Sequence, residues 1–276
     1  MSTFTLPDSD GVSVFLVDDL TEKQILEFPA FKIWIKTLQR NLQTQTLDPS
    51  HEFHKSPYRL QKITIQSIDR FGGGRLGFVK LQAEVQNREG ESLPGAVFLR
   101  GPSVGMLVLL QPDDLPAGSQ QEKYVLLTVQ ARVASGGLQF VELPAGMVDG
   151  GGFAGAAAKE IKEELGLEIP EDQLTNLTEL AIPPAESDAA KESLPRAIFP
   201  SAGGCDEFIP IFLHEKRVPR SQLKEWTGRL TGLRDEGEKI TLKLVKLEDL
   251  WREGARDAKA LGAWALYEGL KKDGKL

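Results

Sequence analysis

Residues 146–167 of this 276-residue chain read GMVDGGGFAGAAAKEIKEELGL, and this stretch decides the expected fold and chemistry. Glu160, Glu163 and Glu164 stand at helical i, i+3 and i+4 spacing, just before Gly166, a residue type that commonly ends helices. At ~100° per residue the three carboxylates fall within about 100° of one another. The stretch therefore predicts one helix with a dense stripe of negative charge.

Such a stripe is typical of either a metal-binding site or a helix face exposed to solvent. Like charges at this spacing repel and weaken a helix unless cations lie against them, and Mg²⁺ and Mn²⁺ prefer carboxylate oxygen. Taken alone, the three glutamates are equally compatible with a charged helix face that meets only solvent. Ala154, Ile161 and Leu165 group on a separate apolar face, which predicts that the helix packs against a core.

The residues before the helix predict a strand and a loop. Residues 141–146 read VELPAG, a strand that ends in a proline and glycine turn. Residues 149–152 read DGGG, which indicates a flexible loop before the alanine-rich start of the helix. The order is thus strand, loop and glutamate-bearing helix.

This order resembles the signature of the Nudix hydrolases, whose helix reads Arg-Glu-apolar-x-Glu-Glu-x-Gly-apolar. Residues 159–167 read KEIKEELGL. Three departures stand out: Gly152 occupies the place of the family's loop glutamate, the segment from there to the helix motif is one residue short, and Lys159 replaces the arginine. Lysine keeps the charge but lacks the planar fork of arginine, so it cannot orient a neighbouring glutamate through two parallel hydrogen bonds.

The residues LPAG at 143–146 resemble the nucleoside diphosphate sugar branch of this family, and so do FPSAGGCDE at 199–207 and GLRDEGE at 232–238. The likeness is closest to the plant-type ADP-sugar diphosphatases and covers roughly residues 97–276. It implies an α/β (α+β) fold, namely a Nudix α/β/α sandwich with a mixed sheet. A smaller N-terminal domain with a helix and antiparallel strands is expected before it.

We expect the domain boundary in the polar connector 87–94, with an N-terminal domain at 1–93 and a Nudix domain at 94–276. The first domain is predicted to hold a helix within 21–45, with its clearest start near Ala30 after Pro29, and an antiparallel hairpin within 58–86. In the resembling enzymes this domain pairs two subunits, which implies a homodimer. Further strands are expected at 96–99, 104–110, 124–131, 138–143, 177–182, 208–214 and 239–245, and a last helix at 257–269.

Composition restricts the classes of partner. The formal net charge is −7 and no basic stripe appears, which argues against a nucleic-acid surface. The longest apolar runs, such as 104–110, fall short of the ~20 residues of a membrane span. Residues 1–20 carry four aspartates instead of a basic signal start, and Cys205 is the sole cysteine, so we expect no membrane contact, no intrachain disulfide and a cytoplasmic location.

The resemblance assigns a Mg²⁺ site, with Mn²⁺ as a substitute, to the Ala145 backbone carbonyl, Glu160 and Glu164. Glu163 is either a further ligand or the residue that orients the others. Glu238 is the first choice for the general base and also an additional metal ligand, and Glu236 is the alternative base. Without the helix upstream, these two residues would be read as part of an ordinary charged turn.

Substrate contacts are expected from residues of several segments. Arg132 follows a predicted strand where the resembling enzymes place an arginine that binds the diphosphate, and Arg100 and Arg196 are weaker candidates. Trp34 is either a core residue or an aromatic contact with a partner subunit or with a base, such as adenine, on which its ring could stack. The remaining two candidates are Gly146, in the turn before the helix, and Glu207, which follows two glycines and is expected to begin a strand.

The expected activity is metal-dependent hydrolysis of ADP-sugars such as ADP-glucose or ADP-ribose, to AMP and a sugar 1-phosphate. Two alternatives remain open. One is hydrolysis of another nucleoside diphosphate derivative. The other is a catalytically silent Nudix-like domain that senses a nucleotide sugar, which the missing loop glutamate and Lys159 would favour.

Overall fold

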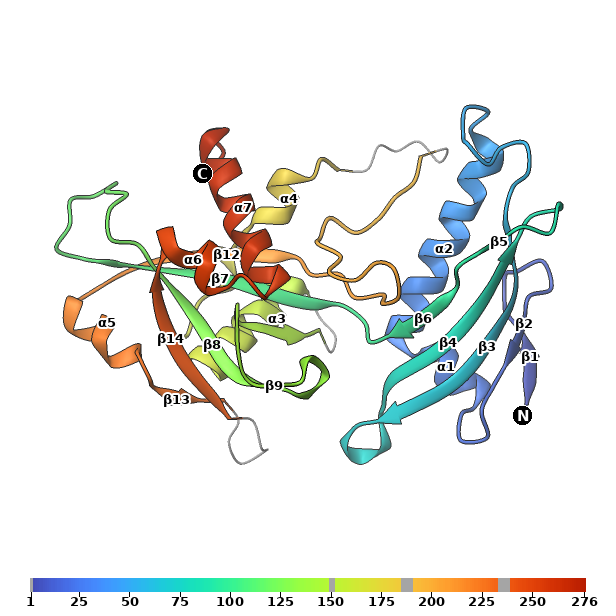
Figure 1. The fold of residues 1–276 in the computed structure, drawn as a ribbon, viewed down its shortest axis with the longest axis horizontal. Coiled ribbons are helices and arrows are strands. Elements are labelled where there is room, and N and C mark those ends of the chain that lie inside the picture. Colours follow the sequence, from blue (N-terminus) through green and yellow to red (C-terminus); the bar gives the residue numbers. More distant parts are fainter. Residues whose placement is uncertain (1, 149–151, 185–190, 233–238) are drawn as a thin grey trace. The chain divides into compact units, whose positions relative to one another are not determined.

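The structure, a computed structural model, describes residues 2–148, 152–184, 191–232 and 239–276 (Figure 1). The chain forms two compact units. The first contains Met1–Pro102, Pro184–Pro195 and Ser201–Phe208, and the second contains Ser103–Pro183, Arg196–Pro200 and Ile209–Leu276. The division into domains at 1–93 and 94–276 stays a prediction, and each unit is described by itself below.

The first unit is built on a mixed sheet with the order β1-β2-β3-β4-β5, in which β6 also pairs with β4. The expected hairpin is confirmed, because β3 and β4 pair antiparallel along most of their length. One pair outside the hairpin, β2 with β3, is parallel. The strands are β1 (Thr3–Thr5), β2 (Ser13–Phe15), β3 (Arg59–Arg70), β4 (Leu76–Gln86), β5 (Ser92–Leu93) and β6 (Ala96–Leu99).

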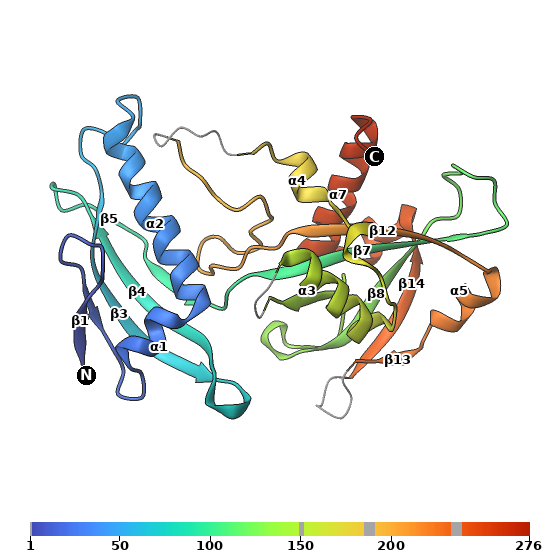
Figure 2. The same ribbon diagram turned by 180° about the vertical axis from the view of Figure 1, so that it is seen from behind.

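Two consecutive helices, α1 (Glu22–Glu27) and α2 (Pro29–Leu47), cover one face of this sheet (Figure 2). Pro29 is the first residue of α2, as its fixed φ angle and missing N–H group favour. Phe31 and Ile35 of α2 are buried against Ile63 and Leu81 of the strands. The expected helix therefore exists, but it is broken at Phe28 into two pieces.

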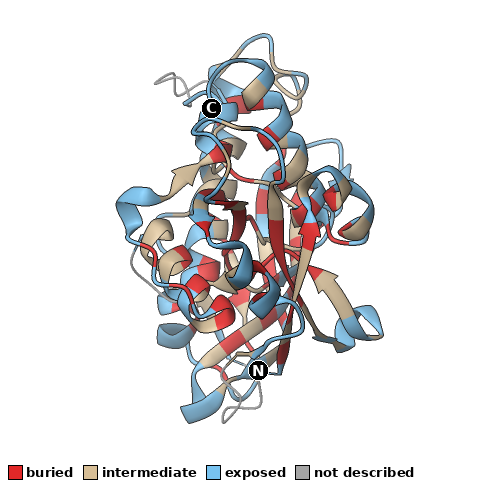
Figure 3. Cartoon of the chain, turned by 90° about the vertical axis from the view of Figure 1, so that its left-hand side faces the viewer, coloured by how far each residue is buried: buried red, intermediate tan, exposed pale blue. Residues whose placement is uncertain are grey.

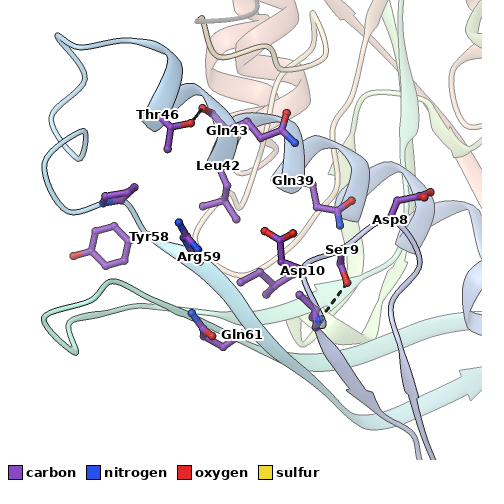
Figure 4. A pocket seen from close by; sticks show the side chains of 13 residues that line it. Asp8, Ser9, Asp10, Gln39, Leu42, Gln43, Thr46, Tyr58, Arg59 and Gln61 are labelled. Carbon is purple, nitrogen blue, oxygen red and sulfur yellow. Dashed lines mark hydrogen bonds between the residues drawn. The ribbon is translucent and has the colours of Figure 1, made fainter.

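A polar groove of about 470 Å³ lies between α2, the β1–β2 turn and the start of β3 (Figure 4). Gln39 and Gln43 line it from the helix, and Asp10 and Arg59 from the strand side. None of the site residues expected from the sequence lines this groove. It is therefore separate from the chemistry considered below.

Gly95 is a point where the first sheet has no room for a side chain. A Cβ atom added there would lie 2.0 Å from the backbone oxygen of Ala83, whose N–H donates to the Gly95 carbonyl at 2.8 Å. Because backbone cannot move aside as a side chain can, we expect Gly95→Ala to reduce the free energy of unfolding by about 3 kcal/mol. Urea unfolding measures this. Gly72→Ala is the control, since nothing lies within 4 Å of a Cβ there, and equal losses in both variants would contradict the steric argument.

The second unit is built on a mixed sheet with the order β11-β12-β7-β8-β14-β13, to which β10 and β9 add by pairing with β7 and β8. Strands β7 and β12 are parallel, and the other pairs are antiparallel. The strands are β7 (Ser103–Pro112), β8 (Tyr124–Arg132), β9 (Gly137–Glu142), β10 (Ala145–Met147), β11 (Thr175–Asn176), β12 (Ile211–Val218), β13 (Leu230–Thr231) and β14 (Ile240–Lys246).

Helices cover both faces of this second sheet. The alternation along β7 shows the two faces, because Met106 and Val108 belong to one core and Leu107 and Leu109 to the other. Buried residues occur on strands and on helices alike (Figure 3). The first core is closed by α3 (Phe153–Glu160) and α5 (Arg220–Trp226). The second is closed by α4 (Leu177–Ala181), α6 (Leu250–Glu253) and α7 (Ala258–Lys272). This is the expected α/β/α sandwich with a mixed sheet.

Two of the strand predictions are wrong, one because the segment is a helix and one because the strand begins later than expected. Residues 177–182 were expected as a strand but form the short helix α4, because the Asn176 side chain accepts a hydrogen bond from the backbone N–H of Glu179 and so caps a helical turn. The strand expected at 208–214 begins only at Ile211, directly after Pro210. Glu207 therefore does not begin a strand.

Within the described parts of the chain, no helix is both long enough and apolar enough to cross a membrane.

Candidate active site

Strand β10 places Ala145 and Gly146 at the edge of the second unit's sheet. The strand pairs antiparallel with β7, and Ala145 lies opposite Gly105. The short Leu143-Pro144 connection turns the chain from β9 into β10, with Leu143 fully buried. The backbone of residues 145–146 therefore has a fixed position from which it can meet the glutamate helix.

The glutamate helix changes its geometry where the carboxylates stand. Residues up to Glu160 are α-helical, and Ile161–Leu165 form a turn of π-helix that ends at Gly166, whose φ angle is +68°. Ile161 and Leu165 are fully buried in the core, which confirms the apolar face. A π-turn is wider than an α-turn and often marks functional sites. The prediction from sequence assumed a uniform ~100° per residue and therefore did not include the π-turn.

Glu164 lies inside the protein instead of on a solvated stripe. Its residue exposure is 2%, and one carboxylate oxygen accepts a hydrogen bond from the Ala145 backbone N–H at 3.2 Å. Burying a carboxylate is costly unless other groups compensate its charge. The position of Glu164 therefore favours a functional role over a surface one.

Glu160 approaches the same backbone segment from one turn earlier. A Cβ atom added at Gly146 would lie 1.7 Å from the Glu160 carboxyl carbon and 1.9 Å from one of its oxygens. The carboxylate thus occupies the space that any side chain at position 146 would need. Two carboxylates of one helix meet the Ala145–Gly146 backbone, which explains why a glycine stands there.

Unlike the buried Glu164, Glu163 is partly exposed to solvent. Its side chain is 26% exposed and lies 3.8 Å from the ammonium group of Lys159, which is itself 66% exposed. This single, exposed ion pair is worth little to stability. Lys159 and Glu163 are therefore paired, but without the bidentate hold that an arginine could supply.

The donor set at this site fits a hard divalent cation. Glu160 and Glu164 offer carboxylate oxygens close to the Ala145–Gly146 backbone, and oxygen ligands of this kind are what Mg²⁺ and Mn²⁺ prefer. Among the residues that the structure describes, no three His, Cys, Asp or Glu side chains form a metal-binding group by themselves. Glu238, the first choice for the base and also an additional ligand, lies outside the described residues, as does Glu236, the alternative base.

Arg132 ends β8 and binds a carboxylate that the sequence did not suggest. Its Nε atom donates to Glu142 at 2.7 Å, and its side chain is 42% exposed while that of Glu142 is 4% exposed. Glu142 also contacts the ammonium group of Lys259 at 3.2 Å. The sequence does contain one indication that Glu142 is special, because this single carboxylate interrupts the apolar residues just before the LPAG turn.

Arg100 and Glu207 lie together in the first unit. They form an ion pair of 2.9 Å, and the neighbouring Asp206 accepts hydrogen bonds from the backbone N–H groups of Arg100 at 2.7 Å and Gly101 at 3.2 Å. Burial raises the pKa of the Asp206 carboxyl despite these bonds, and it also raises the pKa of the Cys205 thiol. The thiol is therefore not activated as a nucleophile.

The remaining candidates lie away from the helix in sequence. Trp34 is partly buried on α2, packs against the core of the first unit and has its ring centroid 5.9 Å from that of Phe31. Arg196 lies in the second unit, 3.5 Å from the Glu179 carboxylate. Stacking of Trp34 on adenine and phosphate binding by Arg196 stay predictions.

A mixed sheet between two layers of helices, with a glutamate helix set against a strand and glycine turn, is the arrangement expected of a Nudix domain. Residues 100–265 match the NUDIX domain, and the chain belongs to the Nudix family. It is 36% identical over 255 residues to Nudix hydrolase 14, chloroplastic, from Arabidopsis thaliana, an alignment that covers 91% of this chain and 74% of that protein. A solved structure described as an ADP compounds hydrolase is similar with a TM-score of 0.46 and 19% identity, over 79% of this chain and 99% of that one.

Proposed function

We propose that this chain is a divalent-metal-dependent hydrolase of nucleoside diphosphate sugars, and that ADP-sugars such as ADP-glucose and ADP-ribose are its substrates. The observation that carries the proposal is the convergence of the Glu160 and Glu164 carboxylates on the Ala145–Gly146 backbone. The relation to an Arabidopsis protein named as a Nudix hydrolase supports hydrolysis. The choice of a sugar-linked diphosphate rests on the LPAG turn and the segments at 199–207 and 232–238.

We assign each residue of the site one role in metal binding, substrate binding or proton transfer. Glu160, Glu164 and the Ala145 carbonyl would hold Mg²⁺, which when bound neutralises diphosphate charge and makes a bound water more acidic. Arg132 binds phosphate oxygens through its guanidinium group. Glu163 orients the other glutamates, and Glu238, or else Glu236, accepts the proton of the attacking water.

The reaction balances without any further reactant. A water oxygen attacks one phosphorus of the anhydride, the bond from that phosphorus to the bridging oxygen breaks, and the proton passes to the base. ADP-glucose would give AMP and glucose 1-phosphate. ADP-ribose would give AMP and a ribose phosphate.

Assembly and location are separate parts of the proposal. We propose a homodimer, with the first unit in a pairing role, and light scattering of the purified protein measures it. A cytoplasmic location was expected from the sequence, whereas the Arabidopsis relative is named as chloroplastic. Imaging of the tagged full-length protein distinguishes the two compartments.

Release of the nucleoside monophosphate from a panel of nucleoside diphosphate sugars tests the activity, and AMP is the product from ADP-sugars. We expect release from ADP-sugars with Mg²⁺ or Mn²⁺, complete loss after EDTA treatment and recovery when the metal is restored, because the proposed metal neutralises the diphosphate charge and makes the attacking water more acidic. UDP-sugars and dinucleotides in the same panel test the alternative substrates.

The outcomes separate the alternatives. Release from dinucleotides or UDP-sugars alone would keep the hydrolase and overturn the ADP-sugar class. Tight binding of an ADP-sugar with no hydrolysis under any metal would favour the silent sensor. No binding and no hydrolysis across the panel would contradict both.

A further inference from the structure

A cluster of four charged side chains contacts the chain at Leu143, in the connection between β9 and β10. Glu142 and Asp257 are 3% and 4% exposed, and they contact the cations Arg132 and Lys259. The formal charges of the four groups balance. All four belong to the second unit, and Glu142 stands three residues before Ala145.

Asp257 ties this cluster to the backbone on both sides. One of its oxygens accepts a hydrogen bond from the Leu143 N–H at 2.8 Å, between β9 and β10. The other accepts from the Lys259 N–H at 3.1 Å and so caps the N-terminus of α7. The Lys259 ammonium contacts the same oxygen at 3.0 Å. These hydrogen bonds and the contact with Lys259 explain the burial of Asp257 by a structural role alone.

Glu142 has a different set of partners. One oxygen accepts from the Lys259 ammonium at 3.2 Å, and the other accepts from Arg132 Nε at 2.7 Å. Burial lowers the pKa of Lys259, but the charges and hydrogen bonds of Asp257 and Glu142 outweigh that effect and leave its pKa raised. Lys259 is thus a constant positive charge, and Glu142 links it to the one member of the cluster that is strongly exposed to solvent.

A hydrogen bond to Nε fixes the plane of a guanidinium group. The two terminal nitrogens lie in that plane, so their directions are set once Nε is held. Buried ion pairs seldom add stability beyond what apolar side chains of equal volume would give. A buried carboxylate that holds an exposed arginine is therefore better explained by orientation of the arginine than by stability.

We infer that Glu142 is a positioning residue of the active site, which holds the Arg132 guanidinium in the orientation that receives the substrate diphosphate. Lys259 keeps the Glu142 carboxylate in place. The inference rests on the proposed function in one respect only, since it takes Arg132 as the diphosphate-binding arginine. A purely structural role of Glu142 is the competing explanation.

A double-mutant cycle distinguishes the two explanations. We expect Arg132→Ala to lower kcat/KM for the ADP-sugar about a hundredfold, because the binding group is removed, and Glu142→Gln about tenfold, because a misdirected group keeps only part of its contribution. In the Arg132→Ala background, Glu142→Gln should change kcat/KM less than about twofold, since there is nothing left to orient. Glu253→Gln is the matched control, as it removes a half-exposed ion pair to Lys243 in the same unit.

Equal losses from Glu142→Gln with and without Arg132 would overturn the inference. A second measurement does not depend on activity. The Nε–H group of Arg132, assigned by comparison with Arg132→Lys, should show restricted motion in ¹⁵N relaxation of the wild type and greater motion in Glu142→Gln. If it is equally mobile in both, Glu142 does not position it. If the wild type hydrolyses nothing while Nε is ordered, the proposed function fails and the positioning stands.

Discussion

Replacing Glu164 by glutamine is expected to reduce hydrolysis of ADP-sugars by roughly a hundred- to a thousandfold. The magnitude follows from the loss of a metal-bound charge, which is worth several kcal/mol, at 1.36 kcal/mol for each factor of ten. The fold should be unaffected, because glutamine has the same shape and its amide oxygen can still accept the 3.2 Å hydrogen bond from the Ala145 N–H. Steady-state kinetics with Mg²⁺ measures the loss.

Thermal unfolding gives a second result for the same variant. Glu164 is buried, so a metal ion that it holds would bind the folded protein and not the unfolded chain. Added Mg²⁺ should raise the Tm of the wild type but not that of the variant, because only a ligand that binds the folded state stabilises it.

Glu168→Gln is the control for both measurements. Glu168 stands just beyond the same helix, is 78% exposed and pairs with Lys162, so its charge should not affect the metal. A Glu164→Gln variant that kept wild-type turnover, or that still gained Tm with Mg²⁺, would remove Glu164 from the metal site.

Much of the second unit could be predicted because its signals are local. Alternating or continuous apolar runs marked β7, β8 and β14, and helical spacing marked the buried face of the glutamate helix at Ile161 and Leu165. These patterns arise from burial against a single core, which a window of a few residues already reflects. The resemblance to the family signature then assigned Ala145, Glu160 and Glu164 to one site.

The wrong or missing predictions concern structure that depends on interactions beyond a window of a few residues. Residues 177–182 are as apolar as a strand, but the Asn176 cap favours a helical turn. The π-turn at Ile161–Leu165 and the burial of Glu164 depend on packing against the rest of the unit. Glu142 and Arg132 are ten residues apart in sequence and meet only because β8 and β9 pair. Long-range pairing of this kind selects which charged residues become partners.

Substitution of Gly146 by alanine is expected to lower kcat/KM about a hundredfold with little loss of stability. The added Cβ would lie 1.7 Å from the Glu160 carboxyl carbon, so that carboxylate must move, and a shift of about 1 Å at a reacting site can cost a factor of 10². The obstacle is the end of a flexible side chain and not backbone. The free energy of unfolding should therefore change by less than about 1 kcal/mol, in contrast to Gly95→Ala, where the obstacle is the Ala83 carbonyl.

A rescue experiment tests the cause of that loss. Aspartate is one methylene shorter than glutamate, so Glu160→Asp alone should impair catalysis by withdrawing the carboxylate from the Ala145–Gly146 backbone. In the Gly146→Ala background the same withdrawal makes room for the new methyl group, so the double variant should be more active than Gly146→Ala alone. Kinetics of the four proteins decide the matter. Losses that simply multiply would mean that the methyl group acts on something other than Glu160, because independent sites do not compensate one another.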